Sequence, residues 1–444
     1  MGCADPIKAI LILAAGSVAL MAQDTRTVVE PKIPPACVAL QSQLPATLSE
    51  ADETKTDTAR IQGALDKCGK GKAVVLTGGA FLSGPLQLRA GVTLALDAGT
   101  TLHASRNARD YDVTPGACGT VTKVGRGCKP LIAGVSVDDA GVMGDGTIDG
   151  RGAMKILGRK DSWWDLAQEA KVKNLNQSCP RIMQISRCNN FTLYKITLKN
   201  SPQFHVAYSG GNGFTAWGVK IDTPKAGRNT DGIDPGNSTN VTITHCYINA
   251  GDDNVAIKAG TGAPTGNMTI SHNHFYGGHG MSIGSETDGG ASNILVTDLS
   301  IDGADNGLRI KSNSSRGGLV KNVVYEDVCI RNVKNPIYMD SNYSFRGEAT
   351  DRPPHFADIV LRNVAVSTPG KLTLQGYDAT HRLGIAFDGV QVPAETKVVA
   401  AQADITLGPG GSNIVATGDA VTVTGTPSTA NPNACGAKFV AFPR

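Results

Sequence analysis

The sequence predicts an all-β protein, a right-handed parallel β-helix (solenoid) with a short N-terminal capping helix. A short alternating run of apolar residues recurs along the chain, which is typical of stacked short strands. No helical pattern of ~10–15 residues separates the strands of this repeat, as a βαβ fold would require. Gly makes up 53 of 444 residues and aromatic residues only 5%, which suits a narrow core with little room for large rings.

Each repeat opens on a polar residue or Gly, as in Asn240-Val241-Thr242-Ile243. A second short strand follows in several repeats, at 255–257, 281–283 and 308–310. Such coils bury their apolar positions against the coils above and below. A β-propeller is the alternative, but its period of ~40–50 residues is too long. The repeats open, at intervals of 23 to 36 residues, at Asn190, Gly213, Asn240, Asn267, Asn293, Asn322 and Asp358.

The N-terminal part of the sequence predicts a signal peptide and, after it, a helix that caps the solenoid. An apolar stretch over 9–22 is too short to span a membrane comfortably, so residues 1–22 are expected to be a signal peptide of a secreted protein. Residues 57–67 read as a capped amphipathic helix that hides the open end of the solenoid. The first clear strands follow at 73–76 and 92–96.

Nine cysteines remain after signal removal, which suits an exported protein and leaves at least one thiol free. Cys118 with Cys128, and Cys179 with Cys188, are local disulfide candidates. Cys246 and Cys329 lie on strand-like repeats and are expected to be buried thiols. The nine are Cys37, Cys68, Cys118, Cys128, Cys179, Cys188, Cys246, Cys329 and Cys435.

No linker divides the repeats, so residues 23–444 are expected to form a single domain, with the catalytic coils at about 213–345. The net charge of +3 and pI of about 8.3 are too mild to indicate nucleic-acid binding. No further apolar stretch is long enough for a membrane span once the signal is removed. A monomer is expected.

Four short segments carry the chemistry: 229–231 (Asn-Thr-Asp), 251–253 (Gly-Asp-Asp), 278–280 (Gly-His-Gly) and 309–311 (Arg-Ile-Lys). Aligning the second strands by their apolar positions places Asp231, Asp253, His279 and Asn306 in one column, on coils ~4.8 Å apart. Asp252 shares the turn of Asp253. Arg309 and Lys311 are expected to face outward, because Leu308 and Ile310 take the inward positions.

Each segment alone has an ordinary structural interpretation, since Asp, Asn and Gly are common turn residues and exposed cations are usually solvated. The four segments taken together are not explained by these structural roles. Stacked carboxylates repel one another, which should raise the pKa of at least one of them. Carboxylates beside a His and two cations indicate acid–base chemistry on an anionic substrate. Arg228 and Lys258 add positive charge nearby.

The four segments, in this order, resemble the signature of family 28 glycoside hydrolases, the polygalacturonases. The third matches at full length as 278–285, and Tyr343 matches a Tyr that follows the last motif in the family. Residues 144–152 followed by Trp163-Trp164 are similar to bacterial secreted pectinases in particular. The resemblance covers about residues 45–400 and implies the parallel β-helix.

The resemblance implies hydrolysis of α-1,4 bonds between galacturonic acid units in de-esterified pectin (polygalacturonate), with inversion and without a metal or other cofactor. Asp252 would be the general acid, with Asp231 and Asp253 activating the water. His279 would keep the acid protonated. The substrate would be bound by Asn229, Arg309, Lys311 and Tyr343.

Three alternatives remain. One is a related hydrolase that attacks chain ends or rhamnogalacturonan, although no obvious insertion blocks the groove, which favours endo attack. A pectate lyase would need calcium ligands and an Arg base, whereas His279 and the Asp252-Asp253 pair favour hydrolysis. The third is a non-catalytic β-helix that binds polysaccharide.

Overall fold

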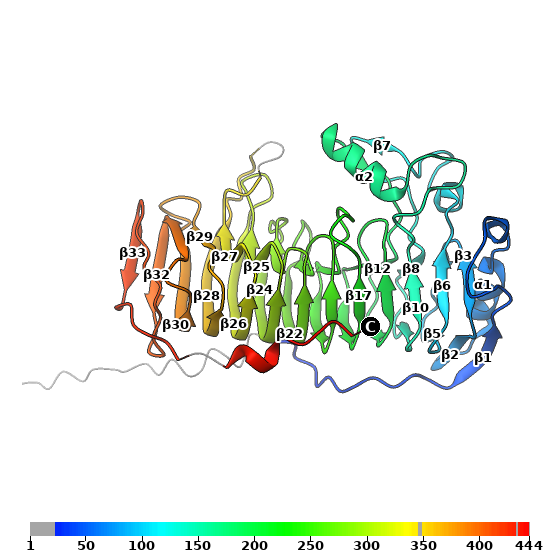
Figure 1. Ribbon diagram of the computed structural model, residues 1–444, viewed down its shortest axis with the longest axis horizontal. Coiled ribbons are helices and arrows are strands. Elements are labelled where there is room, and N and C mark those ends of the chain that lie inside the picture. The colour runs from blue at the N-terminus through cyan, green and yellow to red at the C-terminus, as the bar shows by residue number, and fades with distance from the viewer. Residues whose placement is uncertain (1–22, 345–348, 432–433, 444) are drawn as a thin grey trace, which may run out of the picture.

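The computed structural model describes residues 23–344, 349–431 and 434–443, and it has the predicted parallel β-helix fold. Two sheets of parallel strands run along the stack of coils (Figure 1). The 20-stranded sheet contains β1 (Ala36–Gln41), β2 (Lys72–Thr77), β3 (Ala80–Ser83), β5 (Val92–Leu96), β6 (Thr101–Ala104), β9 (Gly141–Met143), β10 (Thr147–Asp149), β13 (Phe191–Tyr194), β14 (Thr197–Lys199), β16 (Asn212–Trp217), β17 (Lys220–Asp222), β19 (Thr239–Thr244), β20 (Tyr247–Asn249), β22 (Thr265–Tyr276), β24 (Ala291–Asp302), β26 (Leu319–Arg331), β28 (His355–Val366), β30 (Leu383–Gln391), β32 (Ala403–Leu407) and β33 (Val421–Thr424).

The second sheet has 11 strands and contains the second strand of each repeat. Its strands are β4 (Leu86–Gln87), β8 (Ile132–Val135), β12 (Met183–Ser186), β15 (Val206–Ser209), β18 (Ile233–Gly236), β21 (Val255–Ile257), β23 (Met281–Gly284), β25 (Asn306–Lys311), β27 (Asn335–Asp340), β29 (Lys371–Gln375) and β31 (Lys397–Ala401). The core lies between the two sheets and is built from their inward apolar residues, such as Ile243, Ile257 and Ile283, all fully buried.

The repeat predicted from the sequence is the register of the 20-stranded sheet. Phe214 pairs with Val241, Val241 with Met268, and Met268 with Ile294, each one residue after the opening polar residue or Gly. The openers adopt positive φ, which Asn and Gly tolerate best. Their side chains also form a ladder, in which Asn293 donates to Asn267 at 3.0 Å and Asn322 donates to Asn293 at 2.7 Å.

The predicted capping helix is α1 (Thr58–Lys67), which buries Ile61 and Leu65 over the first coil. Asp57 lies at its N-cap, but the carboxylate makes no capping bond. It accepts instead from Arg60 at 2.5 Å and from the backbone N–H of Leu82 at 3.1 Å, because the neighbouring strand offers a buried donor. The cap is therefore attached to the solenoid by this carboxylate.

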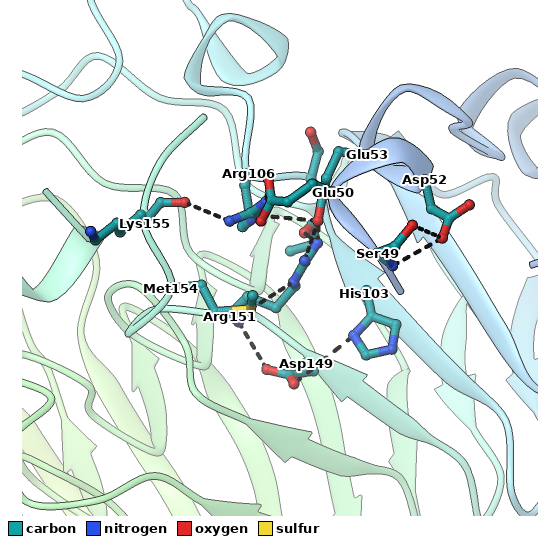
Figure 2. A network of polar contacts seen from close by, with 12 residues as sticks. Ser49, Glu50, Asp52, Glu53, His103, Arg106, Asp149, Arg151, Met154 and Lys155 are labelled. Atoms are coloured by element: carbon teal, nitrogen blue, oxygen red, sulfur yellow. Dashed lines mark hydrogen bonds and ion pairs between the residues drawn. The ribbon is translucent and has the colours of Figure 1, made fainter. Parts of the chain in front are cut away.

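A buried ion network joins the 3₁₀ helix η1 (Glu50–Thr54) to the coil of β10, as Figure 2 shows. Glu53, which is 5% exposed, accepts from Arg106 Nε at 3.1 Å and from Arg151 Nη1 at 3.1 Å. Arg151 also donates its backbone N–H to Asp149 at 2.9 Å. The Arg151 of the 144–152 motif is thus a structural residue that holds the N-terminal segment.

A second helix, α2 (Trp163–Val172), was not expected from the sequence, where no helical segment between strands was recognised. Figure 1 shows α2 projecting from the coil stack beside β7. β7 (Val121–Thr122) pairs antiparallel with β11 (Asn176–Gln177), which follows α2. Ser162 and Asp165 form a capping box at its start, which is a sequence signal that could have located the helix. The remaining 3₁₀ helices are η2 (Ala108–Tyr111) and η3 (Cys435–Lys438).

The cysteine predictions are partly confirmed. Cys118–Cys128 is a disulfide as expected, and Cys246 is a buried thiol. The proposed Cys179–Cys188 pair is wrong, since both residues are buried free thiols. Cys329 is not a thiol, because the C-terminal tail returns along the coils and brings Cys435 to it. The third disulfide, which the sequence did not indicate, is Cys37–Cys68.

The C-terminal tail runs back along the long sheet toward β22, as the red segment in Figure 1 shows. Phe439 lies under the guanidinium of Arg331 at 4.2 Å, and Tyr276 donates to the carbonyl of Val440 at 3.0 Å. The predicted signal peptide, residues 1–22, lies outside the described residues. Within the described ranges, neither α-helix has the length and apolar character needed to cross a bilayer.

Candidate active site

The turns that precede the 11-stranded sheet bring the predicted catalytic residues together. Ile233 pairs with Val255, and Val255 with Met281, so Asp231, Asp253 and His279 occupy the same position on three successive coils. Backbone hydrogen bonds continue this register into the turns. Gly232 N–H donates to the carbonyl of Asp253 at 2.8 Å, and His279 N–H to that of Asp252 at 2.9 Å. The column expected from the sequence alignment is therefore present.

Asp253 is the most enclosed of these carboxylates, at 1% exposure. Its oxygens accept from Lys311 Nζ at 2.7 Å and Arg309 Nη1 at 3.2 Å. Ser282 Oγ donates a third bond, at 2.7 Å. Burial raises the pKa of Asp253, but the charges of Lys311 and Arg309 lower it well below its ordinary range. Asp253 is therefore ionised at neutral pH.

Arg309 and Lys311 differ in one respect from the expectation. They point away from the core, and Leu308 and Ile310 are fully buried inside, as predicted. However, they are only 6% and 5% exposed and form ion pairs with Asp253, two coils away. The ring of Tyr343 covers them, with its centroid 5.1 Å from Arg309 Cζ and 5.6 Å from Lys311 Nζ. The alternation of a strand predicts whether a side chain points toward the core or away from it. It does not predict which neighbouring residues bury an outward side chain.

Asp252 forms a second cluster with His279 and Asn229. His279 Nδ1 lies 3.0 Å from Asp252 Oδ1, and Asn229 Nδ2 donates to Asp252 Oδ2 at 3.4 Å. Burial raises the pKa of Asp252, but the hydrogen bond to His279 and the charges of His279 and Lys311 together outweigh it, so the net pKa is lowered. This direction does not support the expectation that His279 keeps Asp252 protonated, because an imidazole bonded to a carboxylate stabilises its ionised form.

The raised pKa expected among the stacked carboxylates occurs at Asp231 instead. Asp231 is 3% exposed, and its Oδ1 has no hydrogen-bond partner in the described part of the chain. Burial, followed by the charges of Asp234 and Asp252, raises the pKa of Asp231 well above its ordinary value. Burial also raises the pKa of Asp234, the outward residue of β18, to about 7. The site therefore pushes the pKa values of its carboxyl groups apart, as acid–base sites do.

Asp305 is a member of the site that the sequence reading missed. Its Oδ2 lies 3.7 Å from His279 Nε2, so that the imidazole lies between Asp305 and Asp252. Lys225 and Lys334 hold Asp305 at 2.9 Å and 3.3 Å. Asp305 lies on the coil after His279, in the column of Asp252, whereas the alignment placed its neighbour Asn306 in the column of Asp253 and His279.

Gln177 was also missed, because it lies far from the four motifs in the sequence. Its Nε2 donates to Asn229 Oδ1 at 3.1 Å, and it is 4% exposed. Arg228 donates to the carbonyl of Ala167 in α2 at 3.2 Å. The α2–β11 segment therefore packs against the turn that holds Asn229.

The ligand atoms of Asp252, Asp253 and His279 lie within 4.8 Å of one another, close enough in principle for a metal ion. Both oxygens of Asp253 already accept from cationic groups, however, and Ser282 adds a further donor. A divalent cation would have to displace or approach two buried positive charges, which Coulomb repulsion opposes. The donor set thus suits acid–base chemistry better than metal binding.

Comparisons with known proteins agree with this geometry. The family model described as "Glycosyl hydrolases family 28" matches residues 68–406. An endo-polygalacturonase of Pectobacterium carotovorum subsp. carotovorum is 45% identical, over 88% of this chain and 96% of that protein. A polygalacturonase of Ralstonia solanacearum is 40% identical, over 97% of each chain.

Solved structures show the same relation. The polygalacturonase from Erwinia carotovora ssp. carotovora has 45% identity and a TM-score of 0.82, covering 86% of this chain and 100% of that one. An exopolygalacturonase from Thermotoga maritima shares the fold at 20% identity, with a TM-score of 0.72, covering 90% and 94% of the two chains. The chain therefore belongs to glycosyl hydrolases family 28.

Proposed function

We propose that this enzyme hydrolyses the α-1,4 bonds of polygalacturonate, the de-esterified form of pectin, by endo attack with inversion. The observation that carries the proposal is the cluster itself, in which Asp231, Asp252 and Asp253 lie on adjacent turns with pKa values driven in opposite directions. Relatives named endo-polygalacturonases, at 45% identity over most of their length, support the substrate and the mode of attack.

The roles follow from the need for one proton donor and one base. Burial and the charges of Asp234 and Asp252 disfavour ionisation of Asp231, so the proposed mechanism has the cluster share one proton. In the free protein the raised pKa of Asp231 favours Asp231 as the holder of this proton, and the proposed mechanism moves it to Asp252 before bond cleavage. Asp252 then delivers the proton to the leaving oxygen, with His279 beside it, and Asp231 is left ionised. Asp253, held ionised by two cations, acts with Asp231 on the attacking water.

Substrate recognition is assigned to the residues around this cluster. Asn229 orients Asp252 and can contact the sugar, and Tyr343 lies over the two cations at the edge of the site. Arg309 and Lys311 hold Asp253 and also supply positive charge for a galacturonate carboxylate. Calcium and other cofactors have no assigned role.

The polymer substrate cannot enter a cell intact, and three disulfides suit an oxidising compartment. We therefore propose that the enzyme acts outside the cell, with residues 1–22 removed as a signal peptide. We also propose that a monomer of residues 23–444 is the active form, because successive coils of the chain assemble the catalytic cluster.

The test is turnover of polygalacturonate by the wild type and by Asp252→Asn. We expect reducing ends to appear without an unsaturated product, and the product sizes to fall rapidly to intermediate oligomers. Asp252→Asn should reduce turnover by about 10²–10⁴-fold with unchanged thermal unfolding. An unsaturated product would indicate a lyase, and release of monomer alone would indicate an exo enzyme. Cleavage of rhamnogalacturonan but not of polygalacturonate would indicate a different hydrolase. Binding of the polymer without any product would indicate a non-catalytic protein.

A further inference from the structure

A pocket of about 410 Å³ lies outside the catalytic cluster, beside the N-terminal part of the 11-stranded sheet. Its lining includes two arginines, Arg126 and Arg181, and two amide side chains, Gln184 and Gln203. We propose that this pocket is a distal subsite that binds the carboxylate of a polygalacturonate unit several sugars away from the cleaved bond. The inference rests on the proposed function, because it names a further contact with the same polymer.

Neither arginine forms an ion pair among the described residues, although the charges of Asp234 and Asp231 act on Arg181 from a distance. Arg181 Nε donates to Gln203 at 3.2 Å and Nη1 to Gln184 at 3.4 Å, and its guanidinium stacks on Phe204 at 4.7 Å. These contacts fix the plane of the guanidinium but leave its charge uncompensated by an ion pair. Burial lowers the pKa of Arg181 and the charges of Asp234 and Asp231 partly oppose this, so a bound anion would further stabilise the charged guanidinium.

The register of the sheet places this pocket on the same row as the catalytic residues. Gln184 pairs with Ala207, and Ala207 with Asp234, so Gln184 lies two strands before Asp234, or about 10 Å. The row continues two strands further, through Ala256, to Ser282, which donates to Asp253. An extended chain along this row passes over the small Ala207, so one polymer can reach both sites.

The loop that carries Arg126 is constrained. The Cys118–Cys128 disulfide closes the loop, and Val113 N–H donates to the carbonyl of Gly127 at 3.1 Å. The exposed Arg126 is therefore presented to the pocket from a constrained loop. A preorganised arginine loses less entropy on binding a carboxylate than a free one does.

Arg126→Gln tests the subsite, since Arg126 is exposed and belongs to no ion network among the described residues. Arg187→Gln is the matched control, because Arg187 is an exposed arginine on the same coil, just after β12, and is not part of the pocket lining. For Arg126→Gln we expect kcat/KM on polygalacturonate to fall about tenfold, as for loss of one charge-assisted hydrogen bond at a partly exposed site. Trigalacturonate, which is too short to span both sites, should be cleaved at the wild-type rate.

A second measurement separates binding from chemistry. Calorimetric titration of polygalacturonate into Asp252→Asn and into Asp252→Asn/Arg126→Gln should show weaker binding for the double variant. Equal effects of Arg126→Gln on trimer and polymer, no effect on either, or the same loss in Arg187→Gln would overturn the subsite. If the wild type cleaves no polygalacturonate, the proposed function itself fails, and that result is seen before any Arg126 variant is compared.

Discussion

Replacement of Lys311 by Met tests whether Asp253 depends on the cations around it. Lys311 is 5% exposed and lies 2.7 Å from a carboxylate that is 1% exposed. Breaking a buried ion pair by removing one partner costs about 3–5 kcal/mol of unfolding free energy. Arg309 and Ser282 still donate to Asp253, so we expect the lower end, about 3 kcal/mol.

The pH dependence of this loss follows from the sign of the pKa shift. The pKa of Asp253 is lowered in the folded protein, so the ionised carboxylate contributes stability above its unfolded pKa of about 3.9 and loses it as the pH falls through the folded value. Removing Lys311 raises the folded pKa. The difference between wild type and variant should therefore be full above about pH 5 and shrink below about pH 4.

The measurement is urea unfolding at several pH values, compared with Lys173→Met. Lys173 pairs with Glu169 on the surface of α2 at 57% exposure, and its loss should cost about 0.5 kcal/mol or less. The reasoning is refuted if Lys311→Met is no more destabilising than Lys173→Met, or if its cost does not diminish in acid.

Three further predictions concern other contacts. Asp305→Asn removes the carboxylate beside His279 Nε2, so kcat on polygalacturonate should fall about tenfold with little change in KM; an unchanged kcat would mean that Asp305 does not position the ring. Replacing Cys329 and Cys435 by Ser removes a disulfide between residues that are 106 positions apart and should lower the free energy of unfolding by about 2–5 kcal/mol, measured by thermal or urea unfolding. An unfolding midpoint equal to that of the wild type would mean that the other contacts of the tail are sufficient to hold it. EDTA should leave the initial rate unchanged, because two cations already neutralise Asp253, and loss restored by calcium would contradict this.

The sequence alone determined the coil register and the column of catalytic residues. Asn240, Asn267 and Asn293 recur because each coil needs a residue that tolerates positive φ before its buried strand. The same periodicity aligned Asp231, Asp253 and His279, because stacked coils convert equal positions in a repeat into neighbours in space. In a solenoid each repeat contacts only the repeats next to it, so the repeat pattern of the sequence also gives the arrangement of the fold.

Only the tertiary structure decided how these groups are paired. The ion pairs of Asp253, the position of Gln177 against Asn229 and the Cys329–Cys435 bond join residues that no repeat relates. The pKa directions also depended on it, since the lowered pKa of Asp252 and the raised pKa of Asp231 follow from burial and from individual hydrogen bonds. These quantities depend on distances of a few ångströms between distant segments, and periodicity carries no information about them.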